Sequence, residues 1–269
     1  MHRAAVLGKP IAHSLSPALH NAGYAAARLA DWAYTAIECA ESELPGFVAG
    51  LGPEWSGLSL TMPLKEAALT VADEVTPVAA AIGAANTLVR RADGSWLADN
   101  TDAPGMVDAL RASGVDGLAT VTVLGAGGTA RAAVAAAAAF SVGDVDIVAR
   151  RAEAVDAMRP AAAALGVTLR HVAWEDAAAH ADADLVVSTV PKGVADSLRP
   201  VWRASTVLFD AIYDPWPTPL ASGAAAVGCR IVSGLDLLLY QAVRQFGMFT
   251  GIPGPVAEMR EGLVAARTI

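Results

Sequence analysis

A glycine-rich turn in the middle of the chain is the clearest chemical signal of this sequence. Gly125, Gly127 and Ala130 follow the pattern G-x-G-x-x-A, directly after the apolar run Val121–Leu124. In this pattern the first glycine permits a tight turn, the second lets backbone approach a pyrophosphate, and the small third residue lets a helix pack closely on a strand. Glycine turns also occur in α/β proteins without this role. The place of this one, between a strand and a helix whose amides would face the phosphates, predicts a dinucleotide site.

Two arginines, Arg150 and Arg151, follow the next predicted strand, residues 145–149. An NAD enzyme usually has a carboxylate here that holds the ribose hydroxyls, and Asp146 lies too early in the strand to serve. Guanidinium groups suit a 2′-phosphate instead, through charge-assisted hydrogen bonds. The pair predicts NADP rather than NAD; the alternative is a solvated basic start of a helix.

Hydroxyl, amide and charged residues lie at predicted strand ends within the first hundred residues. Ser14 and Ser16 are two residues apart at a strand-to-helix junction, where hydroxyls beside free helix amides suit a carboxylate, although Ser16 could simply cap that helix. Lys65 is predicted in the first turn of a helix, where its charge opposes the helix dipole. This placement indicates a role, with an exposed lysine as the alternative. Segments 83–87 and 98–105 add an amide and carboxylates at further junctions.

Short apolar runs alternate with helical stretches along the chain, which predicts an α/β protein. In the N-terminal part we expect strands over residues 3–8, 32–38, 58–61, 87–91 and 95–98, the last two forming a hairpin around 92–94. In the second part we expect strands over 121–124, 145–149, 167–172, 185–189 and 207–211, with helices between them, as a doubly wound, Rossmann-like sheet requires. Long helices are expected from residue 233, including one around 256–266 that returns to the first domain.

These elements predict three parts of the chain. Residues 1–103 would form an α/β substrate-binding catalytic domain, residues 104–232 the NADP-binding domain, and residues 233–269 C-terminal helices that pack on the first domain. The 269-residue length allows two modest domains with real cores.

The composition narrows the class of function. The chain is 54% hydrophobic and 17% charged, which is typical of a compact globular protein. Its net charge of -8 argues against nonspecific nucleic-acid binding. We expect no membrane span and no signal peptide, and therefore a cytoplasmic protein. The two cysteines lie far apart in sequence and the five histidines lack ligand spacing, so neither a disulfide framework nor a metal site is expected.

Taken together, these segments resemble the shikimate dehydrogenase family. The resemblance covers nearly the whole chain and depends on ordered motifs: GKPIAHSLSPALHN, LTMPLK, GAANT, ADNTDAPG, GAGGTAR, YDPWPTPL and residues 234–241. It implies reversible, NADPH-dependent reduction of 3-dehydroshikimate to shikimate, on the route to aromatic amino acids. The implied partners are small molecules, and both a monomer and a homodimer remain open.

The resemblance also implies a role for individual residues. Lys65 and Asp102 match the family's catalytic pair and would contact the substrate. The other implied substrate contacts are Ser14 and Ser16 on the carboxylate, and Thr61, Asn86 and Gln241 on ring hydroxyls. The implied cofactor contacts are Gly125, Ala126, Gly127, Gly128, Thr129 and Ala130 in the turn, Arg150 and Arg151 at the 2′-phosphate, and Tyr213 and Gly234 on the nicotinamide side.

This chain departs from the family's pattern at three places. Ser59 stands where the family often has Asn, and Ser233 where it often has Asp. Residues 149–151 read Ala-Arg-Arg instead of the common Asn-Arg-Thr, which leaves the adenosine contacts open.

One alternative function remains close: a quinate/shikimate dehydrogenase that uses NAD. Arg150 and Arg151 weigh against it, because that enzyme would have an acidic residue there. The paired serines disfavour a methylene-tetrahydrofolate dehydrogenase, and the intact Lys65 and Asp102 disfavour a non-catalytic NADPH-binding regulator. A serine hydrolase built on Ser14 and His13 lacks the nucleophile-elbow pattern.

Overall fold

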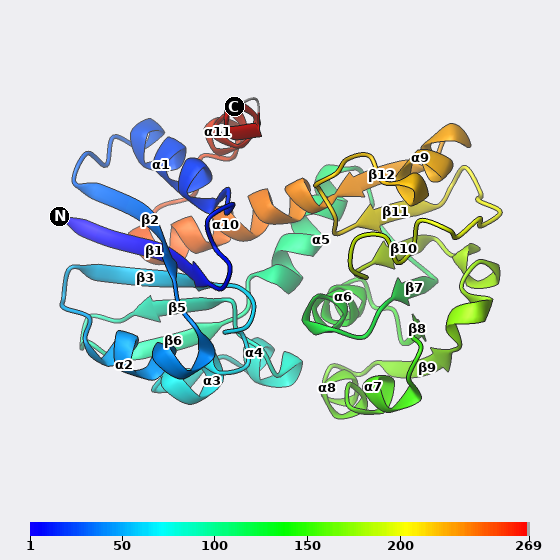
Figure 1. Ribbon diagram of the computed structural model, residues 1–269, viewed down its shortest axis with the longest axis horizontal. Coiled ribbons are helices and arrows are strands. Elements are labelled where there is room, and N and C mark those ends of the chain that lie inside the picture. The colour runs from blue at the N-terminus through cyan, green and yellow to red at the C-terminus, as the bar shows by residue number, and fades with distance from the viewer. Residues whose placement is uncertain (268–269) are drawn as a thin grey trace. The chain divides into compact units, whose positions relative to one another are not determined.

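Two six-stranded sheets organise the part of the chain that the computed structural model describes, residues 1–267 (Figure 1). Each sheet belongs to its own compact unit. Unit 1 contains Met1–Gly105 and the chain from Leu238 onward, and unit 2 contains Met106–Leu237. The chain passes from one unit to the other within α5 (Asp102–Ala112) and within α10 (Gly234–Thr250).

The sheet of unit 1 is mixed, with the strand order β2-β1-β3-β5-β6-β4. Its strands are β1 (His2–Gly8), β2 (Trp32–Glu38), β3 (Trp55–Leu60), β4 (Glu74–Val75), β5 (Thr87–Arg90) and β6 (Trp96–Asp99). β1 pairs in parallel with β2 and β3, whereas β5 runs antiparallel to both β3 and β6. The predicted hairpin is therefore confirmed. The strand predicted over 58–61 begins earlier, at Trp55, and the two-residue β4 was not predicted.

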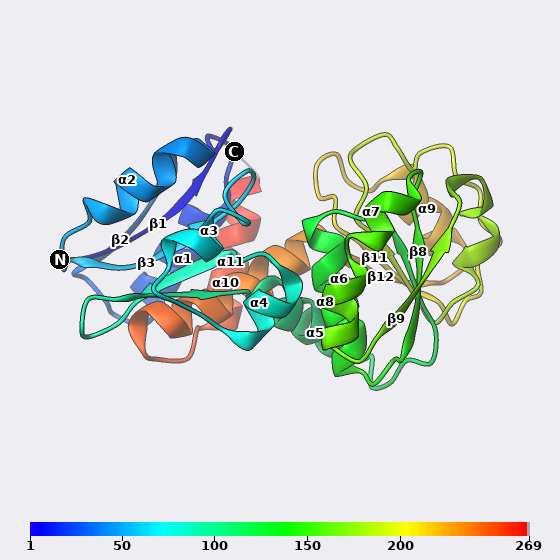
Figure 2. The ribbon, with the colours of Figure 1, turned by 90° about the horizontal axis from the view of Figure 1, so that it is seen from below.

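Helices cover both faces of this sheet (Figures 1 and 2). One face carries α2 (Leu44–Ala49), α3 (Ala68–Val71) and α4 (Pro77–Ile82). The other carries α1 (Ser16–Ala26), the part of α10 in unit 1, and α11 (Val256–Arg267). α11 packs against α1, since a Cβ added to Gly262 would lie 2.5 Å from that of Ala22. The predicted return of the C-terminal helices is confirmed.

Alternation along β3 assigns its side chains to the two helical layers. Leu58 and Leu60 lie in the apolar core beneath α2. Gly57 and Ser59 face the opposite way, toward α10: a Cβ on Gly57 would collide with the Phe249 ring, and Ser59 contacts Gln245. Successive strand residues point to opposite faces, so this register decides which polar side chains meet α10.

The sheet of unit 2 is parallel throughout, with the order β12-β11-β10-β7-β8-β9. Its strands are β7 (Val121–Leu124), β8 (Asp144–Val148), β9 (Thr168–Val172), β10 (Leu185–Ser188), β11 (Val207–Asp210) and β12 (Arg230–Ser233). This is the order of a doubly wound sheet whose direction of winding changes between β7 and β10, and it confirms the predicted fold class.

The crossovers of unit 2 differ from the prediction in detail. α6 (Gly128–Ala139), α7 (Ala152–Asp156), α8 (Arg159–Ala164) and α9 (Pro219–Ala226) occupy three of them, while only short 3₁₀ turns join β9 to β10. Residues 189–206, between β10 and β11, contain no helix, and Pro191, Gly193 and Pro200 interrupt that segment. The prediction of a helix in every crossover is wrong here. β12 was not predicted, because its four residues run directly into α10.

No helix within residues 1–267 has both the length and the apolar character needed to span a membrane. Within the same range, no group of His, Cys, Asp and Glu residues has an arrangement that could hold a metal ion. Cys39 and Cys229 are free and buried.

Candidate functional site

One edge of the unit 1 sheet collects the polar segments singled out in the sequence. β1, β3 and β6 all end at this edge, and β5 begins there, because Ser59 pairs with Thr87 and Thr87 pairs with Asp99. The loops after Gly8, Leu60 and Asp99 therefore emerge together with the residue before Thr87. Binding sites of α/β proteins form at such strand ends, where loops supply side chains and the sheet holds them in place.

Lys65 and Asp102 form an ion pair at this edge. The Lys65 Nζ lies 2.6 Å from the Asp102 Oδ2, and the side chains are 26% and 10% exposed, respectively. The backbone carbonyl of Lys65 also accepts a hydrogen bond from the Ala85 amide, at 2.8 Å. The expected position of Lys65 within a helix is wrong: residues 62–67 form turns, and α3 begins only at Ala68. The Lys65 side chain is therefore oriented by the Asp102 carboxylate and not by the dipole of a helix.

Asp102 is held in place by the residues around the start of α5. It is the first residue of that helix, and the Asn100 Oδ1 accepts hydrogen bonds from the amides of Asp102 and Ala103, at 3.0 and 3.2 Å. The Asn100 Nδ2 donates to the Ala84 carbonyl, at 2.9 Å. Sequence reasoning did not assign a function to Asn100. An Asn just before a predicted helix was the available signal.

The carboxamide of Asn86 connects this pair to α10. Its Nδ2 donates to the Asp102 Oδ1 at 2.8 Å and lies 3.4 Å from the Gln241 Oε1. Its Oδ1 accepts from the Thr101 amide at 2.8 Å, so the two ends of the amide have different environments. Four of the predicted residues, Lys65, Asn86, Asp102 and Gln241, thus form one hydrogen-bonded group.

Gly105 lets α10 come this close to α5. A Cβ at Gly105 would lie within 3.0 Å of the backbone and Cβ of Gln241. Any larger residue would push Gln241 away from Asn86. Gly105 ends the ADNTDAPG motif, but its sequence context gave no indication of this helix contact.

The loops after β1 and β3 carry Ser14, Ser16 and Thr61. The Ser14 Oγ accepts a long hydrogen bond, 3.4 Å, from the Ser16 amide. Leu15 occupies the cap position of α1 and Ser16 is its first helical residue, so the reading of Ser16 as the N-cap is wrong. Thr61 lies against Gly8, where an added Cβ would collide with its methyl group. The Gly8 position therefore brings the loops after β1 and β3 together.

The glycine turn in unit 2 presents open backbone. Gly125 has a φ of 109°, and a Cβ there would lie 2.6 Å from the Thr189 Oγ1. Gly127 and Gly128 are exposed, with nothing within 4 Å of an added Cβ. α6 starts at Gly128 without an acidic residue in its first turn, and its Ala130 is buried. Uncapped amides with open space before them are suited to an anion.

Arg150 and Arg151 lie at the same edge of the unit 2 sheet as this turn. β8 is parallel to β7, and the Gly125 amide donates to the Val148 carbonyl at 2.9 Å. Both arginines are exposed, and neither forms an ion pair with any of residues 1–267. Asp146, by contrast, is bound to Arg170 and to the His180 Nδ1, at 2.5 and 2.8 Å.

Tyr213 and Gly234 are neighbours in unit 2. A Cβ on Gly234 would collide with the Ala211 carbonyl and lie 3.2 Å from the Tyr213 ring. The loop that carries Tyr213 is tied back to buried Asp210, whose carboxylate accepts from the Thr218 Oγ1 at 2.7 Å and from the Ile212 amide at 3.2 Å. Burial raises the pKa of Asp210, against the effect of these hydrogen bonds. Sequence reasoning did not single out Asp210.

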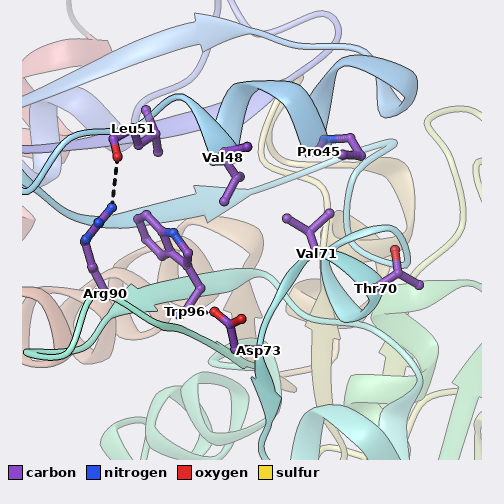
Figure 3. Close-up of a pocket in the computed structure, with 10 residues that line it drawn as sticks. Pro45, Val48, Leu51, Thr70, Val71, Asp73, Arg90 and Trp96 are labelled. Atoms are coloured by element: carbon purple, nitrogen blue, oxygen red, sulfur yellow. Dashed lines mark hydrogen bonds between the residues drawn. The ribbon is translucent and has the colours of Figure 1, made fainter.

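A cavity of about 440 Å³ lies elsewhere in unit 1, among α2, α3 and the β5–β6 hairpin (Figure 3). The Arg90 guanidinium lies 5.3 Å from the centre of the Trp96 ring and donates to the Leu51 carbonyl at 3.1 Å. None of the predicted substrate or cofactor residues lines this cavity. It is therefore separate from the site built around Lys65.

Known proteins resemble this chain over nearly its whole length. Residues 6–88 match the family model of the shikimate dehydrogenase substrate binding domain, and residues 234–263 match that of the shikimate 5'-dehydrogenase C-terminal domain. A relative from Moorella thermoacetica, shikimate dehydrogenase (NADP(+)), is 37% identical over 267 residues, which cover 95% of this chain and 90% of that protein.

Two solved structures carry the likeness into three dimensions. The shikimate dehydrogenase of Mycobacterium tuberculosis is 46% identical, with a TM-score of 0.89 and coverage of 98% of this chain and 100% of the other. The shikimate 5-dehydrogenase of Thermus thermophilus, solved in complex with NADP(H) and shikimate, is 33% identical, with a TM-score of 0.86 and coverage of 99% and 100%.

Proposed function

Because this chain belongs to the shikimate dehydrogenase family, we propose that it catalyses the reversible, NADPH-dependent reduction of 3-dehydroshikimate to shikimate. The observation that carries the proposal is the Lys65–Asp102 pair, 2.6 Å apart and bound by Asn86 at the strand edge of unit 1. The pair supplies an ammonium group on a partly exposed side chain, held in one orientation by the Asp102 carboxylate.

Lys65 and Asp102 would stabilise the charge that develops during the reaction and supply the proton. NADPH supplies the hydride that adds to the C3 carbon of the substrate. Negative charge then develops on the attached oxygen, where the Lys65 ammonium stabilises it and donates a proton. Asp102 orients Lys65 through its Oδ2 and binds the neighbouring ring hydroxyl.

The remaining substrate contacts would come from the same edge. Ser14 and Ser16 hold the substrate carboxylate beside the start of α1, where helix amides favour negative charge. Thr61, Asn86 and Gln241 hold ring hydroxyls. Support comes from the hydrogen bond of Asn86 to Asp102 and its proximity to Gln241, which bring these polar groups together at one edge of the unit 1 sheet.

The residues of unit 2 fit NADP. The turn at Gly125, Ala126, Gly127, Gly128, Thr129 and Ala130 would hold the pyrophosphate through backbone amides. Arg150 and Arg151 would hold the 2′-phosphate; their exposure and their lack of ion pairs within residues 1–267 support this assignment. Tyr213 and Gly234, which lie against each other, would line the nicotinamide side.

Initial rates with shikimate and quinate, each with NADP and with NAD, test the proposal. We expect turnover largely confined to shikimate with NADP. Comparable turnover of quinate with NAD would favour the alternative enzyme and contradict the role given to Arg150 and Arg151. Absence of turnover in all four combinations would overturn the proposed reaction.

Two further expectations accompany the function. We expect the enzyme to act in the cytoplasm as a monomer or a homodimer. Light scattering on the purified protein measures its mass and decides between the two states.

A further inference from the structure

A row of buried polar side chains lies behind Asn86, on the face of the unit 1 sheet that carries α10. Its members are Tyr34, Ser59, Gln245 and Thr87, all of which are buried. Ser59 and Gln245 lie 186 residues apart in sequence, and are 4% and 0% exposed. The function proposed above does not use them. A buried polar group lowers the stability of the fold unless it is hydrogen-bonded, so four such groups in one row must satisfy one another.

The hydrogen bonds of this row run in one direction. The Tyr34 hydroxyl donates to the Ser59 Oγ at 2.6 Å, and the Ser59 Oγ donates to the Gln245 Oε1 at 2.7 Å. The Gln245 Nε2 donates to the Thr87 Oγ1 at 2.9 Å, and that hydroxyl donates to the Asn86 Oδ1 at 2.9 Å.

The same direction continues into the site. With its Oδ1 filled by donors, Asn86 presents Nδ2 to the Asp102 Oδ1. A carboxylate only accepts hydrogen bonds, so it is the natural end of the row. Asp102 then keeps its other oxygen for the Lys65 ammonium.

Gln245 contacts Asn86 in two ways. Its Nε2 donates to the Asn86 backbone carbonyl at 3.1 Å, in addition to the bond through Thr87. Ser59 and the Asn86 carbonyl together set which end of the Gln245 amide faces Asn86, because only Oε1 can accept the Ser59 proton and only Nε2 can donate to the carbonyl. If the amide turned over, Thr87 would have to donate to Gln245 and would lose its bond to Asn86.

We propose that Gln245 and Ser59 are positioning residues for the proposed reduction: they fix the orientation of Asn86, and through it the Asp102 carboxylate that holds Lys65. The inference depends on the proposed function, since Asn86 and Asp102 are its substrate contacts. Neither Gln245 nor Ser59 touches substrate; both act through the Asn86 amide.

Two variants of the row separate this role from ordinary core stability. Ser59→Ala removes the bond to Tyr34 and the bond to Gln245, whereas Tyr34→Phe removes the Tyr34 bond and leaves Ser59 bound to Gln245. Tyr34→Phe is therefore the matched control. Gln245→Met has a side chain of similar length and removes the bonds to Ser59, to Thr87 and to the Asn86 carbonyl, while the bond from Thr87 to Asn86 stays. Ser59→Thr keeps a hydroxyl at position 59.

Steady-state kinetics on these variants, with shikimate and NADP varied in turn, provide the test. We expect Ser59→Ala and Gln245→Met to lower kcat/KM for shikimate about tenfold, the loss typical of one or two hydrogen bonds, with a raised KM for shikimate. KM for NADP should stay at the wild-type value, and both Tyr34→Phe and Ser59→Thr should stay close to wild type. Thermal unfolding of every variant measures how much of each is folded.

The results that would contradict the positioning role can be told apart from a loss of folded protein and from a failure of the proposed function. A smaller folded fraction lowers kcat while leaving both KM values unchanged, and that result in Ser59→Ala and Gln245→Met would overturn the positioning role. Equal losses in Tyr34→Phe and Ser59→Ala would also overturn it. An inactive wild-type protein would overturn the proposed function and this inference together, whereas an active wild type with unaffected variants overturns the inference alone.

Discussion

The edge of the unit 1 sheet and the edge of the unit 2 sheet are built in different ways. In unit 1, Lys65, Asn86, Asp102 and Gln241 form a group linked by hydrogen bonds before any ligand is considered. In unit 2, the corresponding edge consists of open glycine backbone and exposed arginines. Side-chain networks organise the first edge, and backbone geometry with charge organises the second.

This difference follows from what each edge is proposed to bind. A small ring with several hydroxyls is distinguished by directed donors and acceptors, which must be held in one orientation to be effective. The phosphates of a dinucleotide are recognised by helix amides and guanidinium groups. Their attraction to an anion does not require that the arginine side chains be fixed before the ligand binds. Substitutions at the unit 1 edge should therefore slow the chemical step, whereas substitutions at the unit 2 edge should weaken cofactor binding.

The largest effect is expected at Lys65. Lys65→Ala removes the group that would stabilise charge and donate the proton, so we expect kcat to fall ~10²–10⁴-fold with a much smaller change in KM for shikimate. Steady-state kinetics in the direction of shikimate oxidation measure it. Lys9→Ala is the matched control, because Lys9 follows β1 in the same unit and its exposed ammonium lies 3.7 Å from the Glu38 carboxylate. A near-normal kcat in Lys65→Ala would refute the assignment.

A smaller effect, on cofactor binding, is expected at Arg150. Arg150→Ala should raise KM for NADPH about 10–100-fold, the worth of a hydrogen bond to a charged group, and should hardly alter KM for shikimate. The control is Arg170→Ala, which removes the same charge from the same unit but from a guanidinium already paired with Asp146. If KM rises equally for both substrates, the variant has lost folded structure instead, and the contrast between the two regions fails.

The smallest effect concerns the acid stability of the buried layer in unit 1. His20 is fully buried and stacks on Tyr34, with ring centres 4.0 Å apart, and burial lowers its pKa from 6.5 to about 3, although the nearby Gln245 amide acts in the other direction. Between these values the unfolded chain binds a proton that the folded protein does not, so stability falls as the pH falls below 6.5. The slope approaches ~1.4 kcal/mol per pH unit for one such group.

His20→Phe keeps a stacked ring and removes this titration. Urea unfolding at pH 7.5, 6.0 and 5.0 should show that wild type loses more stability than His20→Phe on acidification. Parallel losses in the two proteins would mean that His20 does not carry this pH dependence. The result would sharpen the comparison, because His20 lies in the buried layer of unit 1, whereas Arg150 and Arg151 of unit 2 are exposed.

Sequence reasoning succeeded where the chemistry is local. The glycine turn was predictable because Gly125 needs a positive φ and Ala130 needs to be small, and both requirements belong to a single strand-to-helix junction. Sequence reasoning failed where a tertiary contact, and not the local sequence, decides the position of a side chain. Lys65 was assigned to a helix start, yet turns precede α3, and the lysine is oriented by a carboxylate 37 residues away.

The sequence by itself determined the α/β class, the glycine turn, the charged pair at residues 150–151 and the residue types at each strand end. These depend on hydrophobic periodicity and turn chemistry, which act over a few residues. Only the tertiary structure decided that Asn86 meets Asp102 and Gln241, and that Ser59 reaches Gln245. Those contacts depend on sheet register and on the close packing of α10 against Gly57 and Gly105, which no local pattern encodes.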